Sequence, residues 1–168
     1  MTVNAATARI LLLAIALGGC VSPAPAMPPT FDPLAFFTGP SRGEGTLKII
    51  ARPSVAIRVE SHGRPDGKGG IILDQTIREG AKPARQRRWV LRRTSPTTMA
   101  GTITDAPGPV AGRLDGDRLI LAYRMKDGLK AEQVLTIQPG GRSLVNRMTV
   151  RKFGLPVARV EEVITKVD

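Results

Sequence analysis

Alternation of apolar and polar residues is the feature that most limits the fold, and it runs from Gly45 to the end of the chain. The clearest example is the run 118–125, in which Leu119, Leu121 and Tyr123 share one face of an extended strand. Turn residues interrupt the alternation at short intervals, and no stretch has the 3.6-residue period of an amphipathic helix. This pattern predicts antiparallel β-structure made of short consecutive strands.

The positions of the turns predict about ten strands. They are expected at residues 47–50, 55–59, 71–78, 86–94, 98–104, 110–114, 118–125, 132–137, 143–151 and 157–167. Residues 61–70, with four Gly and one Pro, are expected to form a turn region. Because closure removes exposed strand edges, we expect an all-β fold, a single antiparallel up-and-down β-barrel of about 8–10 strands. Barrels of about eight strands have room for side chains or for one small ligand.

The N-terminus carries a targeting pattern, in which ten apolar or small residues end at Leu17–Cys20. This stretch is too short to span a membrane as a helix. Its last four residues, Leu-Gly-Gly-Cys, resemble the bacterial lipobox, whose cysteine receives a diacylglyceryl group. We therefore expect a lipoprotein signal peptide at residues 1–19 and lipidation of Cys20. The alternative is an ordinary signal peptide cut after Ala24 or Ala26, with the cysteine discarded.

Residues 20–30 are expected to form a tether, because they hold four Pro among Ala and Ser and no charged residue. Pro-rich chain extends at about 3.1 Å per residue, so this segment reaches about 30 Å. Residues 31–168 then form one domain, which begins at the apolar cluster around Phe31. The expected location is the cell envelope, with a lipid anchor in the membrane, on the outer membrane facing the periplasm.

The formal net charge of +11 is an argument about partners rather than about fold. With one Trp, one Tyr and four Phe, the chain offers little surface for stacking bases, so we expect no nucleic-acid partner. Lipid headgroup phosphates are the anions that an envelope protein meets. One Cys and one His, His62, exclude an internal disulfide and argue against a metal site, and we expect no cofactor. The oligomeric state is left open.

A set of scattered residues supports a family resemblance. They are Phe37, Gly39, Gly43, Gly45, Leu73-Asp74, Arg88-Trp89, Gly101-Thr102, Asp105, Gly108, Gly112, Leu144-Val145-Asn146-Arg147 and Lys152-Phe153-Gly154. From about Phe31 to the C-terminus the chain resembles a family of uncharacterised bacterial lipoproteins, a domain of unknown function. It departs from the family pattern between Val134 and Ser143, where an acidic pair followed by Trp is usual. The resemblance implies a lipocalin-like, calycin-type barrel on the envelope, with no established reaction.

The segment 82–93 is the strongest local charge feature, with six basic residues and no acid. If Trp89 and Leu91 face the core, Arg88 and its neighbour at position 92 point outward and form a solvated basic face. If Val90 faces inward instead, these two arginines line a cavity and bind a carboxylate or phosphate. Arg88 is therefore a candidate ligand-binding residue.

Two aromatic residues are further candidates for ligand binding, Trp89 and Tyr123, because each has a large apolar body with a polar tip. Filling the core is the other role that such residues take in an alternating strand. Asn146 with Arg147 is interpreted as a structural pair that positions a turn or binds Asp74 or Asp105.

Catalysis is the competing class of function, and we assign no catalytic residues. A Ser/His/Asp arrangement would depend on His62, which is expected in a surface turn. Paired-carboxylate chemistry has only Asp74, Asp105 and Glu79 as candidates, in no recognisable motif. Glu161 and Glu162 would alternate to opposite faces of the last strand and so cannot share one site.

The sequence therefore predicts a membrane-anchored envelope lipoprotein, not an enzyme, whose barrel binds a hydrophobic or amphipathic ligand. The first alternative is a non-catalytic interaction protein with a filled barrel and a basic face that docks on anionic lipid or an acidic partner. The second alternative is a hydrolase. An apolar cavity of a few hundred cubic ångströms would favour ligand binding, and a core without a void would argue against it.

Overall fold

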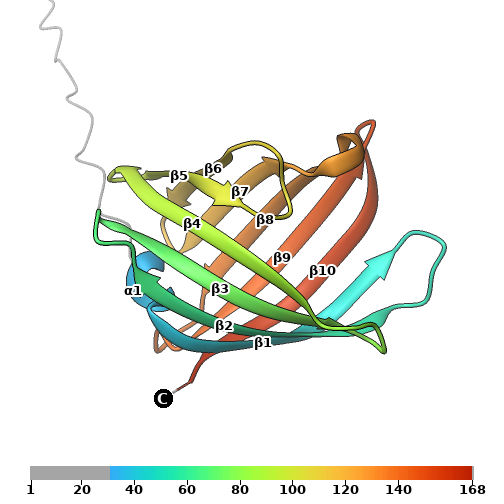
Figure 1. The fold of residues 1–168 in the computed structure, drawn as a ribbon, viewed down its shortest axis with the longest axis horizontal. Helices are drawn as coiled ribbons and strands as arrows, with labels where there is room; N and C mark the ends of the chain where they lie inside the picture. The colour runs from blue at the N-terminus through green and yellow to red at the C-terminus, as the bar shows by residue number, and fades with distance from the viewer. Residues whose placement is uncertain (1–30, 168) are drawn as a thin grey trace, which may run out of the picture.

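The computed structural model describes residues 31–167 as a closed antiparallel barrel of ten strands with one short helix (Figure 1). In chain order the elements are α1 (Pro33–Phe37), β1 (Gly39–Ile49), β2 (Val55–Pro65), β3 (Gly70–Glu79), β4 (Arg85–Ser95), β5 (Thr98–Ile103), β6 (Val110–Asp115), β7 (Arg118–Arg124), the 3-10 turn η1 (Lys126–Gly128), β8 (Lys130–Ile137), β9 (Ser143–Lys152) and β10 (Leu155–Lys166). The predicted all-β up-and-down barrel is confirmed. The predicted signal peptide and the tether with Cys20 lie outside the described residues.

Each strand pairs with the next one along the chain, and β10 closes the barrel by pairing with β1. Residues alternate between the interior and the outer wall, as in β2, where Ile57 and Val59 are buried and Arg58 is exposed. Strand β1 begins at Gly39, eight residues before the predicted start at Leu47. Residues 39–46 were not predicted as strand, because they are mostly small, polar or charged and do not show the alternation of apolar and polar residues.

The expected turn at residues 61–70 is wrong, because β2 continues to Pro65 and the connection is only four residues long. The side chain of Asp66 closes this connection by accepting hydrogen bonds from the backbone N–H groups of Lys68 and Gly70. Gly63 belongs to the strand: a Cβ at this position would lie 1.8 Å from the carbonyl oxygen of Phe37. The glycine thus marks a close approach of two backbones rather than a turn.

Helix α1 plugs one end of the barrel, which we call the plugged end. Asp32 caps the helix by accepting from the N–H of Leu34, and Pro33 occupies its first turn. Lys166 of β10 donates to the carbonyl oxygens of Phe36 and Thr38 at 2.8 and 2.9 Å, which ties the helix end to the last strand. The apolar core extends from this helix into the barrel.

The opposite end, which we call the mouth, is formed by the turns that follow the odd-numbered strands. These are residues 50–54, 80–84, 104–109, 125–129 and 153–154. In Figure 1 the hairpins β1–β2, β3–β4 and β9–β10 reach the right-hand side, away from α1. None of the helices within residues 31–167 has the length and apolar character needed to cross a bilayer.

Candidate functional site

The interior of the barrel is packed near α1 and hollow near the mouth. Leu73, Leu91, Leu121 and Tyr123 are all buried in the packed half, as expected for a filled core. Toward the mouth lies a cavity of about 220 Å³, enclosed by β1–β4 and β8–β10. This volume is below the roughly 300–1,000 Å³ that is typical of small-molecule sites. The cavity therefore has room for part of a ligand or for a small one.

The walls of this mouth cavity are mainly apolar. The apolar lining residues are Leu47, Ile49, Ile57, Val59, Ile77, Met125, Leu129, Met148, Val150, Ala158 and Val160. Most of them occupy inward positions of strands, so the period-two pattern of the sequence directly produces this surface. The two methionines add flexible side chains that can adapt to different ligand shapes.

Polar side chains form the bottom of the cavity, which we call the polar floor. Its members are Gln75, Arg87, Gln133, Asn146 and Glu162, contributed by β3, β4, β8, β9 and β10. Below the floor a second void of only about 40 Å³ reaches Trp89 and the packed core. The floor thus separates the apolar mouth cavity from the filled half of the barrel.

Arg87 is the cation of the polar floor, and its side chain is 14% exposed. Its Nε donates to Gln75 Oε1 at 2.9 Å, and its guanidinium lies 5.5 Å from the ring centre of Trp89. The nearest carboxylate, that of Asp105, is 3.6 Å away and accepts a shorter bond of 2.8 Å from Arg85. Burial lowers the pKa of Arg87, yet an arginine stays protonated at neutral pH. Arg87 therefore keeps N–H donors for a further acceptor.

Gln75 organises the floor through its side-chain amide. Its Oε1 accepts both from Arg87 and from the indole Nε1 of Trp89, each at 2.9 Å, and its Nε2 donates to Ser61 Oγ at 3.0 Å. These bonds fix the orientation of the guanidinium. Arg87 is thus held in place by a network on β2, β3 and β4.

Glu162 and Asn146 form the opposite side of the floor. Asn146 Nδ2 donates to Glu162 Oε2 at 2.8 Å, whereas Asn146 Oδ1 and Glu162 Oε1 are buried without a hydrogen-bond partner. Burial raises the pKa of the Glu162 carboxyl. Gly43 on β1 makes room for this group, since a Cβ there would lie 1.8 Å from Oε1. Unpartnered buried polar atoms are rare and favour a ligand or water that completes them.

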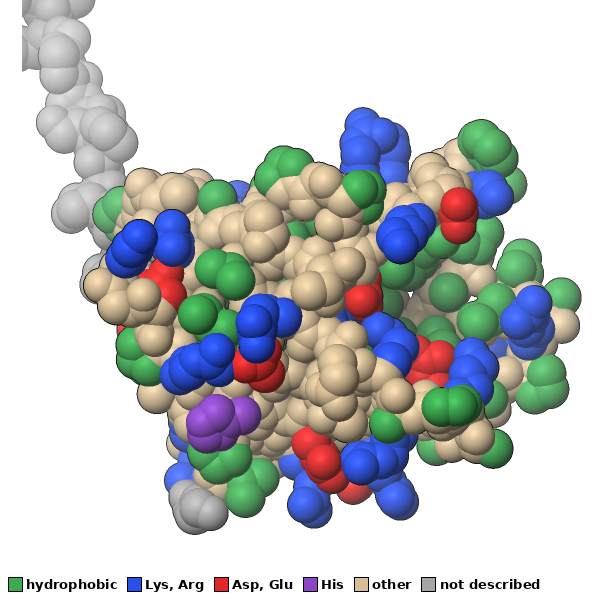
Figure 2. All heavy atoms as spheres, in the orientation of Figure 1, with side chains coloured by type: hydrophobic (Ala, Val, Ile, Leu, Met, Phe, Trp, Pro, Cys, Tyr) green, Lys and Arg blue, Asp and Glu red, His purple; other side chains and the backbone are tan. Residues whose placement is uncertain are grey.

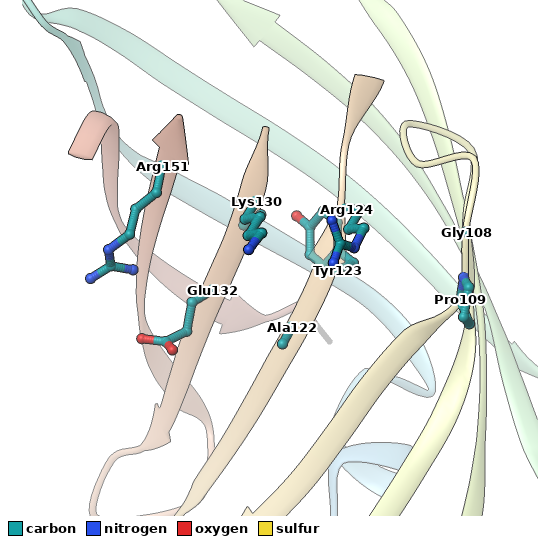
Figure 3. A pocket seen from close by; sticks show the side chains of 9 residues that line it. Gly108, Pro109, Ala122, Tyr123, Arg124, Lys130, Glu132 and Arg151 are labelled. Atoms are coloured by element: carbon teal, nitrogen blue, oxygen red, sulfur yellow. The ribbon is translucent and has the colours of Figure 1, made fainter. Parts of the chain in front are cut away.

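A larger hollow of about 470 Å³ lies on the outer wall, between the β5–β6 connection and strands β7, β8 and β9 (Figure 3). Arg124, Lys130 and Arg151 lie on neighbouring strands β7, β8 and β9, and the strand register pairs Lys130 with both arginines. Glu132 is the acid that lines the same hollow. Because these side chains stand on the outer wall, the hollow is not continuous with the polar floor.

A protein-family model described as "Protein of unknown function (DUF3833)" matches residues 14–166. The chain belongs to the DUF3833 family. This confirms the predicted membership of a family of unknown function, whereas lipidation of Cys20 stays a prediction. No curated protein matches the DUF3833 sequence significantly.

Two solved structures resemble the DUF3833 barrel. The S-type phycobiliprotein lyase CPES from Guillardia theta has a TM-score of 0.64 and 10% identity, over 80% of this chain and 90% of that one. The protein Rv2717c from M. tuberculosis has a TM-score of 0.62 and 17% identity, over 80% and 95% of the two chains. At such identities the likeness establishes a lipocalin-like fold and nothing about ligands.

The candidate Arg88 lies on the outer wall of the DUF3833 barrel, so the alternative in which Val90 faces inward and Arg88 lines the interior cavity does not hold, and a ligand-binding role of Arg88 stays a prediction. Trp89 and Leu91 are buried, which turns Arg88 and Arg92 outward. Arg88 pairs with Asp74 on β3, and Arg92 pairs with the Asp66 carboxylate. The solvated-face interpretation is the correct one, but acids on β3 and its preceding turn neutralise much of that face. The arginine of β4 that faces the barrel interior beside Trp89 is Arg87.

The two aromatic candidates of the DUF3833 chain fill the core. Trp89 and Tyr123 pack edge to face, with ring centres 5.5 Å apart. Tyr123 does not line the mouth cavity, and its hydroxyl lies 3.5 Å from the sulfur of Met148. Trp89 bounds the small void below the floor and reaches the site through its bond to Gln75. The role of both residues in ligand binding stays a prediction.

The remaining candidates of the DUF3833 chain do not all meet in one cleft, although two of the three acids share a partner. Asp74 is on the outer wall, whereas Glu79 and Asp105 both bind Arg85 near the mouth. His62 is exposed, as expected, but on strand β2 rather than in a turn. Within residues 31–167 no cluster of three or more His, Cys, Asp and Glu is placed to hold a metal ion.

Asn146 binds Glu162 rather than the predicted Asp74 or Asp105. As expected, Glu161 and Glu162 point to opposite faces of β10. Glu162 belongs to the interior site, which was not predicted from the sequence. The available signal was its spacing of two residues from the apolar Val160 and Ile164, which share its face.

Proposed function

We propose that this protein is an envelope lipoprotein, held by a lipid on Cys20, whose barrel binds a single-chain amphipathic molecule with an anionic head. The observation that carries the ligand proposal is a buried guanidinium with unused donors, Arg87, at the bottom of an apolar cavity. The proposal is one of binding, without a catalytic step.

The charges around the floor favour an anionic head. Arg85 pairs with Glu79 and Asp105, and Lys82 pairs with Glu79, so these two cations and two anions largely neutralise one another. Arg87 has one hydrogen bond, to a neutral amide. Its nearest carboxylate oxygen, Asp105 Oδ2, is 3.6 Å away and already accepts a hydrogen bond from Arg85. A carboxylate or phosphate can accept two parallel bonds from a guanidinium fork. On the other side of the floor, the raised pKa of Glu162 favours the protonated carboxyl, whose O–H can donate to such a head, whereas Asn146 Oδ1 only accepts.

The apolar walls favour a ligand whose chain points toward the mouth. With its head at the floor, a single acyl chain would contact Ile57, Val59 and Val150 on its way out. A volume of about 220 Å³ cannot enclose a diacyl lipid, which would leave most of its chains outside. We therefore infer a fatty acid or a similar single-chain anion.

The anchor rests on the Leu17–Cys20 motif and on the Pro-rich tether that follows it. Both lie outside the described residues. Phe31, the first described residue, packs against Phe36 of α1, so the tether joins the barrel at its plugged end. The mouth is then the end that stays accessible to a ligand. The location that we propose is the outer membrane, facing the periplasm.

Binding is tested with decanoate, decanol and decyltrimethylammonium, which share a chain and differ in head charge. Trp89 is the only tryptophan and its indole shares Gln75 with Arg87, so its emission reports binding at the floor. We expect decanoate to bind most tightly, and Arg87→Met to weaken it about 10- to 100-fold, as for loss of a charged hydrogen-bonded partner. Arg88→Met, one residue away on the outer wall, should leave the affinity unchanged. Equal affinity for decanoate and decanol would refute the proposal.

The anchor is tested separately by growing cells with a labelled fatty acid and fractionating their membranes. We expect the wild-type chain to carry the label and to sediment with membranes. Cys20→Ser should abolish the label and leave an unprocessed or mislocalised precursor. A soluble, normally processed Cys20→Ser product would show that the segment is an ordinary signal peptide.

A further inference from the structure

The mouth carries exposed apolar side chains on two neighbouring hairpins. Phe153 is 93%, Leu155 70% and Ile50 65% exposed, and these are the three most exposed large hydrophobic residues within residues 31–167. Phe153 and Leu155 belong to the β9–β10 hairpin and Ile50 to the β1–β2 turn. The two hairpins touch, because the N–H of Ile50 donates to the carbonyl of Val157 at 2.9 Å. Together they form one apolar edge.

The position of Phe153 is unfavourable for folding. Lys152 pairs with Leu155, so Phe153 and Gly154 form a two-residue hairpin turn, with φ of 51° and 85°. Such turns require positive φ at both residues and favour Asn-Gly or Gly-Gly, whereas an aromatic residue is strained there. A strained aromatic that is also almost fully exposed contributes nothing to the core. This combination points to a function outside the fold.

Basic side chains surround this apolar edge. Lys152 lies 5.8 Å from the ring centre of Phe153, and the strand register places Arg151 beside Lys130 and Lys48 beside Arg159. Like charges on adjacent strands repel one another. In the part of the chain that the structure describes, none of these five residues has a carboxylate within salt-bridge distance. Their charges are therefore available to an external anion.

We propose that this rim, made of Lys48, Ile50, Arg151, Lys152, Phe153 and Leu155, docks on the surface of an anionic phospholipid bilayer. Apolar side chains enter the headgroup region while the flanking cations bind lipid phosphates, as in other interfacial anchors. Figure 2 shows this combination at the right-hand end of the molecule, where green side chains project beside blue ones.

A second copy of the chain is a poorer occupant of the rim. A symmetric contact through it would bring the same basic residues of both copies together, at a Coulomb cost. A bilayer that contains phosphatidylglycerol supplies negative charge and an apolar interior at once. This docking is independent of Cys20 and of a ligand at Arg87, since it uses side chains on the outside of the mouth.

The test measures how deeply the rim enters the bilayer. The full chain, with Trp89→Phe to remove the native emission, receives either Phe153→Trp at the rim or Val163→Trp on the outer wall of β10, where Val163 is 50% exposed. Both proteins are reconstituted in vesicles of phosphatidylethanolamine and phosphatidylglycerol (about 3:1) with brominated acyl chains, which quench tryptophan on contact. Exchange of the backbone N–H groups of residues 151–155 and 157 in the unaltered chain provides a second measurement that needs no substitution.

We expect emission from position 153 to fall about twofold or more and emission from position 163 to stay constant. Phosphatidylcholine vesicles, or the added changes Arg151→Gln and Lys152→Gln, should remove most of the quenching. Added protection of the N–H groups of residues 151–155 and 157 should likewise appear only with the anionic vesicles. Equal quenching at both positions, or equal quenching in neutral vesicles, would overturn the proposal. So would a concentration-dependent burial of the rim without vesicles, which would indicate a protein partner.

Discussion

The two ends of this barrel carry the same kinds of residue in opposite arrangements. At the plugged end, Phe36 and Phe37 are buried and pack edge to face with ring centres 5.0 Å apart. At the mouth, Phe153 is almost fully exposed. Both ends are therefore aromatic and basic, but only the plugged end uses these residues to hold the fold together.

The charged groups differ between the ends in the same way. At the plugged end Asp32 binds Arg93, and a hydrogen bond from Arg92 lowers the pKa of Asp66 to about 2. In the polar floor, below the mouth cavity, burial raises the pKa of Glu162, and one of its carboxyl oxygens has no hydrogen-bond partner. Stability is thus concentrated at one end, while the other keeps unsatisfied groups that a ligand or a membrane can use.

The largest expected effect is the difference in stability between truncating a phenylalanine at the plugged end and truncating one at the mouth. Phe36→Ala should reduce the free energy of unfolding by about 3–5 kcal/mol, because it removes buried area and leaves a cavity against Phe31 and Phe37. Phe153→Ala should change it by less than about 0.5 kcal/mol, since the ring is in solvent. Urea unfolding measures both variants. Similar losses in the two variants would contradict the division between the ends.

The sequence predicted the barrel well because the strand signal is local. Alternation and turn residues are properties of neighbouring positions, and all ten expected strands are present. Helix α1 was missed because a five-residue helix has too few turns to show a period. Gly63 was misread as a turn residue, since its role depends on Phe37, which is far away in the sequence.

The candidate site was predicted less well, because the inner face of a strand is decided by packing. The interpretation in which Trp89 faces the core correctly predicted that Arg88 faces solvent. Because residues two apart share a face of a strand, it also implied that Arg87 points inward. A buried arginine and a buried glutamate run against the usual cost of desolvation, so Arg87 and Glu162 were not expected inside. Only the contacts with Gln75 and Asn146 show how the fold accommodates them.

An intermediate effect is expected from Glu162→Gln, which removes the titratable group of the polar floor. Because the folded-state pKa is raised above the ordinary 4.5, the native state prefers the protonated carboxyl. The contribution of Glu162 to stability is full below about pH 4.5 and is lost as the pH rises through the folded-state pKa. The variant should therefore gain about 1–2 kcal/mol over the wild type at pH 7 and much less at pH 4.

Urea unfolding of the variant and the wild type at the two pH values measures this difference. The other acidic residues are the same in both proteins, so their contributions to the pH dependence cancel. Glu161→Gln is the matched control, because Glu161 is exposed on the opposite face of β10. A Glu162→Gln effect of equal size at pH 4 and pH 7 would show that the carboxyl is not protonated preferentially in the folded protein. The paired acids at the plugged end and Glu162 in the polar floor would then not differ in how burial affects their ionisation.

The smallest expected effect is a gain in stability from Phe153→Asn. Asparagine tolerates the positive φ of 51° at this turn position better than phenylalanine does, and Asn-Gly is a favoured pair for such a turn. The free energy of unfolding should rise by about 0.5–1 kcal/mol, which thermal or urea unfolding can resolve. Phe153→Ala is the control, since it removes the ring but keeps most of the backbone strain. Equal stability of the Asn and Ala variants would mean that the turn is unstrained. A gain for the Asn variant alone would show that the exposed Phe153 at the mouth lowers the free energy of unfolding.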